Sequence, residues 1–391
     1  MVSACPAPVK VDDSLTVSGE PSTPVTTPSE AAALFSGQRL RLARETRGLS
    51  QRELSDRTSI TAAAISQFEK GSSRPSAATV VELSDGLKFP LQFFAAGIAP
   101  TSTADLDLDL IDGFGHFRSL RSITAAQRRQ ALSVTHLVRD ITAVLGRDVR
   151  LPARDIPWLP IADDDESGAE SRAAEVRRAW GVGPGPVPDV LRLLEQHGVV
   201  AARHGIETSA VSAFSVPFVE HPVVVLHKHG AKRDRDRFSA SHELGHIVMH
   251  EPDQALASKT VETQAHRFAA AFLMPADQIA QELPSKPDWQ RLVQLKQKWA
   301  VSIGALLRRA NTLAIMPDTT YAQAMRTMST RGWRTEEPGD LGAPESPALL
   351  TRAAELAGAS YSELSRATGW PEDCVEDVLA ASADSRPDLA L

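Results

Sequence analysis

Apolar residues recur at intervals of three and four along most of this chain, which is the period of an amphipathic helix. Between residues 36 and 99 the helical periods are short, and they are broken at Gly48, at Ser59 and in the turn from Gly71 to Pro75. This pattern predicts a bundle of about five short helices.

The rest of the chain combines a few strands with many helices. Runs rich in β-branched residues predict two strands, Val211 to Val216 and Pro222 to His227. The segment Pro222 to Leu226 could be either a core strand or an edge that accepts an extended peptide. Helical periods occupy residues 116–151, 173–197, 237–250, 260–273, 276–283, 287–297, 302–314, 347–357 and 362–380. A small sheet among helices is an α+β arrangement.

Changes in composition divide the chain into five parts. The first 35 residues carry Pro, Ser and Thr without an apolar period, which predicts a disordered leader. The predicted parts are a leader at 1–35, an all-α bundle at 36–99, a linker and helical connector at 100–168, an α+β domain at 169–338 and an acidic helical region at 339–391. We therefore expect a multidomain, mainly α protein with one small sheet.

Charge is unevenly distributed along the chain. The formal net charge of −7 argues against nucleic-acid binding by the molecule as a whole. Residues 36–99, however, hold 9 Lys and Arg against 6 Asp and Glu, whereas residues 336–391 hold 3 against 12. The chain therefore has a basic module near its N-terminus and an acidic module near its C-terminus, although its overall net charge is negative.

Cysteines and apolar runs restrict the class of protein. Cys5 and Cys374 lie near opposite ends, and neither has a second cysteine close by. This excludes a disulfide framework and a cysteine-based zinc site, so any metal would be held by histidine and carboxylate. No stretch approaches the roughly 18 apolar residues of a membrane span, and the start of the chain lacks an apolar signal region. We expect a cytoplasmic protein.

The segment His242-Glu243-Leu244-Gly245-His246 carries the strongest chemical signal in the sequence. Two histidines four residues apart project from the same helix face, about one turn from each other, and can hold one cation. Glu243 is rotated by about 100° around the helix, where it can reach water on the open position of a metal. A carboxylate there can act as general base in peptide hydrolysis.

A catalytic zinc ion needs a third protein ligand. The next predicted helix offers Glu262, because an apolar face that includes Ala265 and Phe268 would pack this helix against the first one. His266, one turn beyond Glu262, is a rival ligand or an outer-shell partner. The sequence therefore offers Glu262 as the third ligand beside the two histidines, with His266 as its rival.

Two residues beside the motif leave alternatives open. Arg237 could support the site or stabilise the tetrahedral oxyanion, or it could form a structural ion pair. His250, one turn beyond His246, could be a further ligand if the helix continues, although a packing or surface role is the preferred interpretation.

These motifs resemble the ImmA/IrrE family of metallopeptidases. The resemblance rests on the run from Arg237 to His250, on Glu262-xx-Ala265-xx-Phe268-Ala269 and on Leu273-Met274-Pro275. It extends through Gly185-Pro186, Leu194-Glu195, Gly198-Val199 and Ala213-Phe214-Ser215 upstream, and through Trp299-Ala300-Val301-Ser302, Arg308-Arg309-Ala310 and Gly332-Trp333-Arg334 downstream, over about residues 170–338.

The resemblance implies zinc held by His242, His246 and Glu262, with Glu243 as general base. Members of the family cleave repressors of the Xre type, in phage-like elements or in stress and DNA-damage responses. One position departs from the family pattern, because His266 stands where the family usually has Asn or Asp.

The basic module contains a second motif. Ser50 as N-cap and Glu53 three residues later predict a capping box, Asp56 to Ile60 makes a turn, and Thr61 caps the next helix. Two short helices joined in this way form a helix-turn-helix. The segment Gly37 to Phe94 resembles the Xre/lambda-repressor-like DNA-binding domain. The matching residues are Leu49-Ser50-Gln51-xx-Leu54-Ser55, Ile65-Ser66-Gln67-Phe68-Glu69-Lys70-Gly71 and Arg74-Pro75-Ser76.

The second resemblance implies a set of DNA-binding residues. Those that would face the major groove are Gln51, Thr61, Ala62, Ala63, Ser66 and Gln67, and the candidates for phosphate contact are Arg39, Arg41, Arg44, Lys70 and Arg74. Glutamine can pair with an adenine edge, and alanine can contact a thymine methyl group. Such small side chains give modest specificity per half-site, so we expect a homodimer on double-stranded DNA. The alternative is a helix-turn-helix used for protein contact.

Two functions fit these motifs. The first is a DNA-binding zinc endopeptidase that cleaves a repressor-type regulatory protein, or itself, in response to a signal. The second is a transcriptional regulator whose zincin-like domain serves as a sensor or dimerisation body with little turnover. Glu243 favours the first, because a pure sensor needs no general base.

Overall fold

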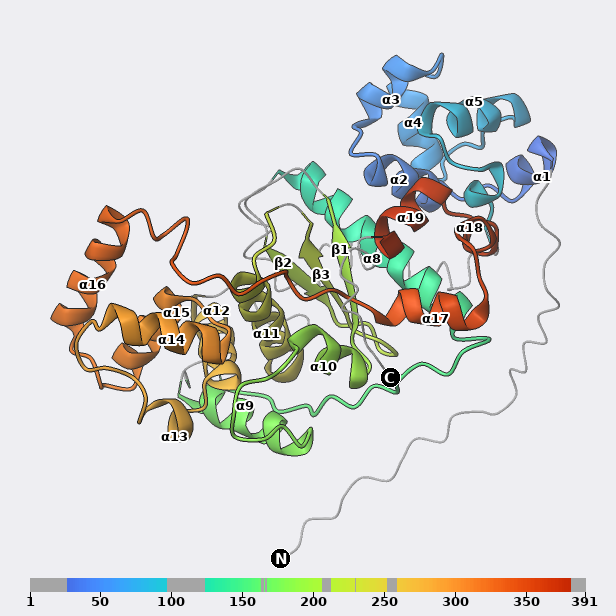
Figure 1. The fold of residues 1–391 in the computed structure, drawn as a ribbon. Helices are drawn as coiled ribbons and strands as arrows, with labels where there is room; N and C mark the ends of the chain where they lie inside the picture. The colour runs from blue at the N-terminus through green and yellow to red at the C-terminus, as the bar shows by residue number, and fades with distance from the viewer. Residues whose placement is uncertain are drawn as a thin grey trace, which may run out of the picture.

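The computed structural model describes residues 27–96, 124–162, 165, 167–205, 212–228, 230–251 and 259–380. Within these ranges helices dominate, and three strands form one sheet. The predicted mainly α architecture, with an all-α bundle at the front and an α+β domain behind it, is confirmed (Figure 1). None of the described helices combines the length and the apolar character that crossing a membrane requires.

Short helices form the N-terminal bundle, as predicted. Their bounds are α2 (Gly37–Thr46), α3 (Gln51–Arg57), α4 (Ala62–Glu69), α5 (Ala77–Leu87) and the 3-10 helix η1 (Leu91–Phe94). The four α-helices begin after Ser36, Ser50, Thr61 and Ser76, whose hydroxyl groups each accept a hydrogen bond from a first-turn N–H. These caps satisfy backbone donors that would otherwise lack a partner, and so they fix where each helix starts.

The prediction of a disordered leader is wrong at its C-terminal end. There α1 (Pro28–Ala33) begins with a capping box formed by Thr27 and Glu30. The helix packs on α5 and η1, and the ring of Phe35 lies edge-on at 6.3 Å from the ring of Phe68. Packing against the bundle therefore orders a segment whose composition alone indicated a leader. Residues 1–26 lie outside the described ranges.

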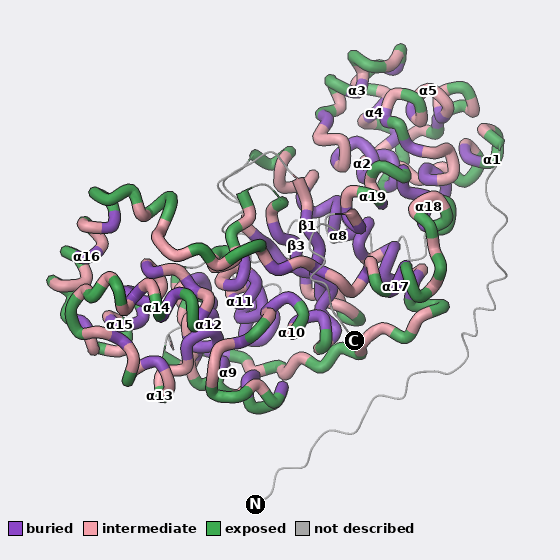
Figure 2. Tube along the Cα trace, viewed as in Figure 1, coloured by how far each residue is buried: buried purple, intermediate pink, exposed green. Residues whose placement is uncertain are grey.

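A long helix, α8 (Ala125–Leu145), runs through the centre of the connector. It packs on α2 of the bundle, on the sheet and on the C-terminal helices. Most of its middle is buried, as the purple stretch in Figure 2 shows. It is shorter than the predicted helix at 116–151, whose first residues lie outside the described ranges.

The sheet contains β1 (Val200–His204), β2 (Ala213–Val216) and β3 (Val223–His227) in the order β1-β3-β2. β1 is parallel to β3, and β2 is antiparallel to it. β1 was not predicted, because Val200-Ala201-Ala202 is short and lacks the β-branched run of a strand. Since β3 pairs on both sides, the proposal that residues 222–226 offer an edge to a peptide is wrong, and the core-strand alternative holds.

Alternate residues of the sheet face two different hydrophobic cores. Val223 and Val225 belong to the core that contains α8 and the bundle. Val224 and Leu226 belong to the core beneath the second half of the chain. This two-residue alternation is the normal side-chain period of a strand. The sheet therefore separates the two hydrophobic cores.

Helices build the second core, on the other side of the sheet. They are α9 (Gly168–Ala179), α10 (Val190–Gln196), α11 (Arg233–Met249), α12 (Lys259–Leu273), α13 (Ala276–Ile279), α14 (Trp289–Trp299), α15 (Ile303–Thr312) and α16 (Asp318–Thr330). α11 packs directly on β2 and β3, and α12 packs along α11. Of this set, α16 was not predicted, and Ala324 and Met328 are the residues it buries.

The C-terminal helices pack near the N-terminal bundle. α17 (Leu349–Ala357), α18 (Tyr361–Thr368) and α19 (Glu372–Ala380) pack on α8, and α18 and α19 lie beside the bundle in Figure 1. The predicted helical period at 362–380 is divided into two helices, because Gly369 has a φ of 75° and Pro371 follows. Bundle, connector and acidic region share one core, and their division into separate domains stays a prediction.

Two carboxylates join the C-terminal region to the sheet domain. Glu345 accepts hydrogen bonds from the N–H groups of Val190 and Leu191 at the start of α10. Glu195, at the end of α10, accepts hydrogen bonds from the N–H groups of Ala348 and Leu349, where α17 begins. Each segment therefore caps the start of the other's helix.

This arrangement predicts a pH-dependent stability difference for Glu195→Gln. Burial raises the pKa of Glu195 from 4.5 to about 7. Because the folded-state pKa is raised, Glu195 contributes its full stabilisation below pH 4.5, and this contribution is lost as the pH rises through about 7. The free energy of unfolding changes by about 3 kcal/mol over this range. The free energy of unfolding of the wild-type protein, measured in urea, should therefore fall relative to Glu195→Gln between these pH values. A constant difference across this range would contradict the assignment.

Candidate metal centre

Three predicted ligands converge between α11 and α12. The Nε2 atoms of His242 and His246 are 3.1 Å apart. Glu262 places Oε2 3.5 Å from His242 Nε2 and Oε1 3.8 Å from His246 Nε2. Tetrahedral zinc with bonds of 2.0–2.2 Å separates its ligand atoms by about 3.4 Å. The donor set and its spacing therefore fit a zinc ion, which would lie among the three side chains.

Close packing of two helices produces this convergence. A Cβ atom on Gly245 would lie only 3.0 Å from the ring of Phe268, so the glycine lets α12 approach α11. Glu262 lies in the first turn of α12 and is buried. His246 is fully buried, whereas His242 is partly exposed, so the site opens on the His242 side.

The predicted general base, Glu243, lies on the face of α11 that meets the sheet. Its side chain is buried, and Ser215 of β2 donates a hydrogen bond from Oγ to Glu243 Oε2 at 2.6 Å. Burial raises the pKa of Glu243 to about 7. The residue that holds it, Ser215, belongs to the family pattern, but the sequence indicates no role for it. Nothing in the local sequence links a strand serine to a glutamate on α11.

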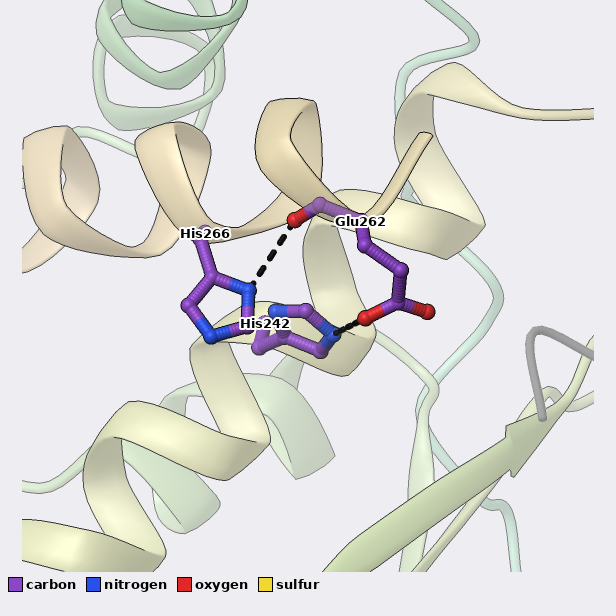
Figure 3. Close-up of side chains that lie close together, drawn as sticks. All are labelled: His242, Glu262 and His266. Carbon is purple, nitrogen blue, oxygen red and sulfur yellow. Dashed lines mark hydrogen bonds and ion pairs between the residues drawn. The ribbon is translucent and has the colours of Figure 1, made fainter. Parts of the chain in front are cut away.

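His266 lies at the mouth of the same site. Donor atoms of His242, Glu262 and His266 lie within 4.8 Å of one another (Figure 3). The Nδ1 of His266 donates a hydrogen bond to the backbone carbonyl of Glu262 at 3.0 Å, and its ring stands edge-on to that of His242 at 4.5 Å. His266 is exposed, and its role as a rival ligand or as an outer-shell partner stays a prediction.

Arg237 is a structural residue, and the proposal that it stabilises an oxyanion is wrong. Its guanidinium is fully buried and pairs with the carboxylate of Glu345. It also donates hydrogen bonds to the carbonyls of Val187 and Ala300. With its donors directed at these partners, Arg237 fixes the start of α11 against the C-terminal region, which is the ion-pair alternative.

His250 is buried behind the candidate ligands. Its Nδ1 lies 3.1 Å from His246 Nδ1, and its Nε2 lies 3.0 Å from Gln264 Oε1. Because both ring nitrogens have these partners, His250 is packed rather than placed as a ligand, in agreement with the preferred interpretation. Gln264 was not singled out from the sequence.

The helix-turn-helix presents most, but not all, of the predicted DNA-binding side chains. Those that are exposed are Thr61, Ala63, Gln67, Lys70 and Arg74, and those that are partly exposed are Arg41, Gln51, Ala62 and Ser66. Arg41 pairs with Glu45, and Gln51 donates a hydrogen bond to Glu69. These exposed and partly exposed positions stay predicted DNA contacts.

Two of the predicted phosphate contacts are wrong. Arg39 is 1% exposed, stacks 3.9 Å from the centre of the Phe93 ring and lies 3.7 Å from Asp140 of α8. Arg44 is buried against Glu69, with its Nε 2.5 Å from a carboxylate oxygen. Both guanidinium groups hold the bundle together and cannot reach a phosphate.

Comparison with known families gives the same two-part composition. Residues 194–311 match the model of the IrrE N-terminal-like domain, peptidase family M78. Residues 40–94 match a helix-turn-helix model. The chain carries an IrrE N-terminal-like domain fused to a helix-turn-helix domain. A search among curated proteins found no match.

The two matches confirm both resemblances noted in the sequence. The IrrE-like match begins in α10 and ends in α15, so it contains the sheet, α11, α12 and the candidate metal centre. The helix-turn-helix match covers α2 to η1, with the exception of the first residues of α2. The chain therefore combines a DNA-binding type of domain with a metallopeptidase type of domain.

Proposed function

We propose that this chain is a DNA-tethered zinc endopeptidase of the cytoplasm, which cleaves a repressor-type regulatory protein, or itself, in response to a signal. The observation that carries the proposal is the convergence of His242, His246 and Glu262 beside a buried general base, Glu243. A metal site used only for structure would be closed by a fourth protein ligand and would need no such base.

The residues of the site have separate roles in peptide hydrolysis. His242, His246 and Glu262 would hold the zinc ion, which when bound polarises a carbonyl group and acidifies water. Glu243 accepts a proton from the attacking water and later donates it to the leaving amine, as a general base and then a general acid. Ser215 orients the carboxylate by holding Oε2.

Cleavage in a purified system tests this function. The protein with one equivalent of zinc is incubated alone and with a panel of purified helix-turn-helix repressors, and fragments are identified by mass spectrometry. We expect fragments with zinc, none after chelation, and their return when zinc is added back. If no fragments form under any condition although zinc is bound, the alternative of a regulator with a non-catalytic zincin-like domain is favoured.

The helix-turn-helix is proposed to bind double-stranded DNA as a homodimer. Gln67 lies on the exposed face of α4, where it can reach a base edge, and Lys70 follows at the end of the same helix. The small residues beside Gln67 limit the specificity of one half-site, which is the reason to expect two copies on one operator.

Two substitutions should change DNA binding in different ways. Gln67→Ala should cost about 1–3 kcal/mol on the preferred site and relax the sequence preference there. Lys70→Ala should weaken binding to all sequences. It should also reduce the slope of log K against the logarithm of the salt concentration by about one. Fluorescence anisotropy at several salt concentrations measures both effects. The matched control is Lys88→Ala, since Lys88 is exposed and follows α5 rather than α4, where its carbonyl accepts a hydrogen bond from Arg47. An equal change in the control would contradict the assigned face.

A further inference from the structure

A chain of hydrogen bonds extends inward from His246, away from the candidate metal position. His246 Nδ1 lies 3.1 Å from His250 Nδ1, and His250 Nε2 lies 3.0 Å from Gln264 Oε1. All three side chains are buried, with exposed fractions of 0%, 3% and 1%. The chain connects the end of α11 to the middle of α12.

The orientation of the Gln264 amide is fixed at its far end. Its Nε2 donates hydrogen bonds to the backbone carbonyls of Ala162 at 2.8 Å and Asp165 at 3.3 Å. Carbonyl oxygens only accept hydrogen bonds, so the NH₂ group must face them and Oε1 must face His250. The backbone at residues 162 and 165 therefore sets which atom of the amide meets the imidazole.

This orientation determines the tautomers of both histidines. Gln264 Oε1 has no hydrogen to give, so His250 Nε2 carries a proton and donates it. In the neutral imidazole the other nitrogen, His250 Nδ1, is then an acceptor. His246 Nδ1 must donate to it, which leaves the lone pair of His246 Nε2 directed at His242 and Glu262.

We propose that His250 and Gln264 are positioning residues that hold His246 in the one tautomer able to bind the metal. The inference rests on the proposed zinc site, which it deepens. A buried hydrogen-bond chain of this kind fixes both the proton and the ring orientation of a ligand before the metal arrives. The two ligand histidines differ in this respect, because His242 Nδ1 is buried without a hydrogen-bond partner among the described residues.

Substitutions that remove one acceptor at a time test the proposal. Gln264→Leu removes the acceptor of His250, and His250→Leu removes the acceptor of His246. His250→Asn is the conservative variant, because Asn Oδ1 occupies nearly the same place as His Nδ1 and still accepts a hydrogen bond. Thr263→Val, on the same helix, is the matched control, since the Thr263 hydroxyl donates its hydrogen bond back to the carbonyl of Lys259 in the preceding turn.

Zinc affinity, measured by competition with a chromophoric chelator, is the first readout. Both leucine variants should bind zinc about 10–100-fold more weakly than the wild type, while His250→Asn and Thr263→Val stay near the wild-type value. Circular dichroism establishes that each variant is folded. Wild-type affinity in folded Gln264→Leu and folded His250→Leu would overturn the proposal.

The tautomer itself is the second readout. Long-range ¹H–¹⁵N correlation spectra of the zinc-free protein should show His246 protonated at Nδ1 in the wild type and in Thr263→Val, and a mixture of tautomers in Gln264→Leu. An unchanged His246 spectrum in Gln264→Leu would also overturn the proposal. This measurement needs neither zinc nor cleavage, so a failure of the proposed peptidase function can be distinguished from a failure of the positioning role.

Discussion

Replacing Glu243 with glutamine is expected to lower the rate of peptide cleavage by about 10²–10⁴-fold, the range for loss of a general base. Glutamine has nearly the same shape and can still accept the hydrogen bond from Ser215, but it cannot take a proton from water. Since Glu243 is not among the three candidate ligands, the variant should bind zinc with unchanged stoichiometry. Initial rates of fragment formation, with zinc content measured on the same samples, check this result.

A matched control separates the chemical role of Glu243 from the removal of a negative charge. Asp234→Asn changes a carboxylate in the first turn of α11, where Asp234 lies 3.6 Å from Lys296 and more than two turns from His242. It should cleave at close to the wild-type rate. If Glu243→Gln cleaves as fast as the wild type, the assigned mechanism is wrong. If neither the wild type nor Glu243→Gln cleaves, the alternative of a regulator with a non-catalytic zincin-like domain is favoured.

Local sequence rules predicted the candidate ligands because the determinants are close together in the chain. His242 and His246 share a helix face by their spacing alone. Glu262 could be added because the apolar residues of the next helix, Ala265 and Phe268, indicated how that helix would pack. The starts of the helices in the bundle could also be predicted from the sequence, since a capping serine and a glutamate three residues later lie within one turn.

The errors have a common physical cause, which is that their determinants lie far away in the sequence. Arg237 looked like a possible oxyanion donor because its partner, Glu345, is 108 residues away. Arg39 looked like a phosphate contact because nothing nearby indicated that Phe93 and Asp140 would cover it. The position of a basic residue on a short helix does not reveal what packs on that side. Ser215 and Gln264 were given no role for the same reason.

The second large effect is expected at Trp370, which joins the acidic C-terminal region to the bundle. The side chain is fully buried, and its ring lies 5.0 Å from that of Phe93 and 5.9 Å from that of Phe89. Its Nε1 donates a hydrogen bond to Asp140 Oδ2 at 2.8 Å. Trp370→Ala should therefore lower the free energy of unfolding by about 3–5 kcal/mol, the cost of truncating a buried aromatic side chain.

Urea unfolding followed by circular dichroism measures this loss, with Trp158→Ala as the control. Trp158 is 45% exposed, so its removal should change the free energy of unfolding much less than that of Trp370. Trp370 belongs to the core of the bundle and α8, whereas α11 and α12 pack in the core on the other face of the sheet. Zinc affinity should consequently be unchanged in folded Trp370→Ala. Equal stability of the two variants would mean that the acidic region does not complete the core of the bundle, and a loss of zinc affinity would mean that the two cores are coupled through the sheet.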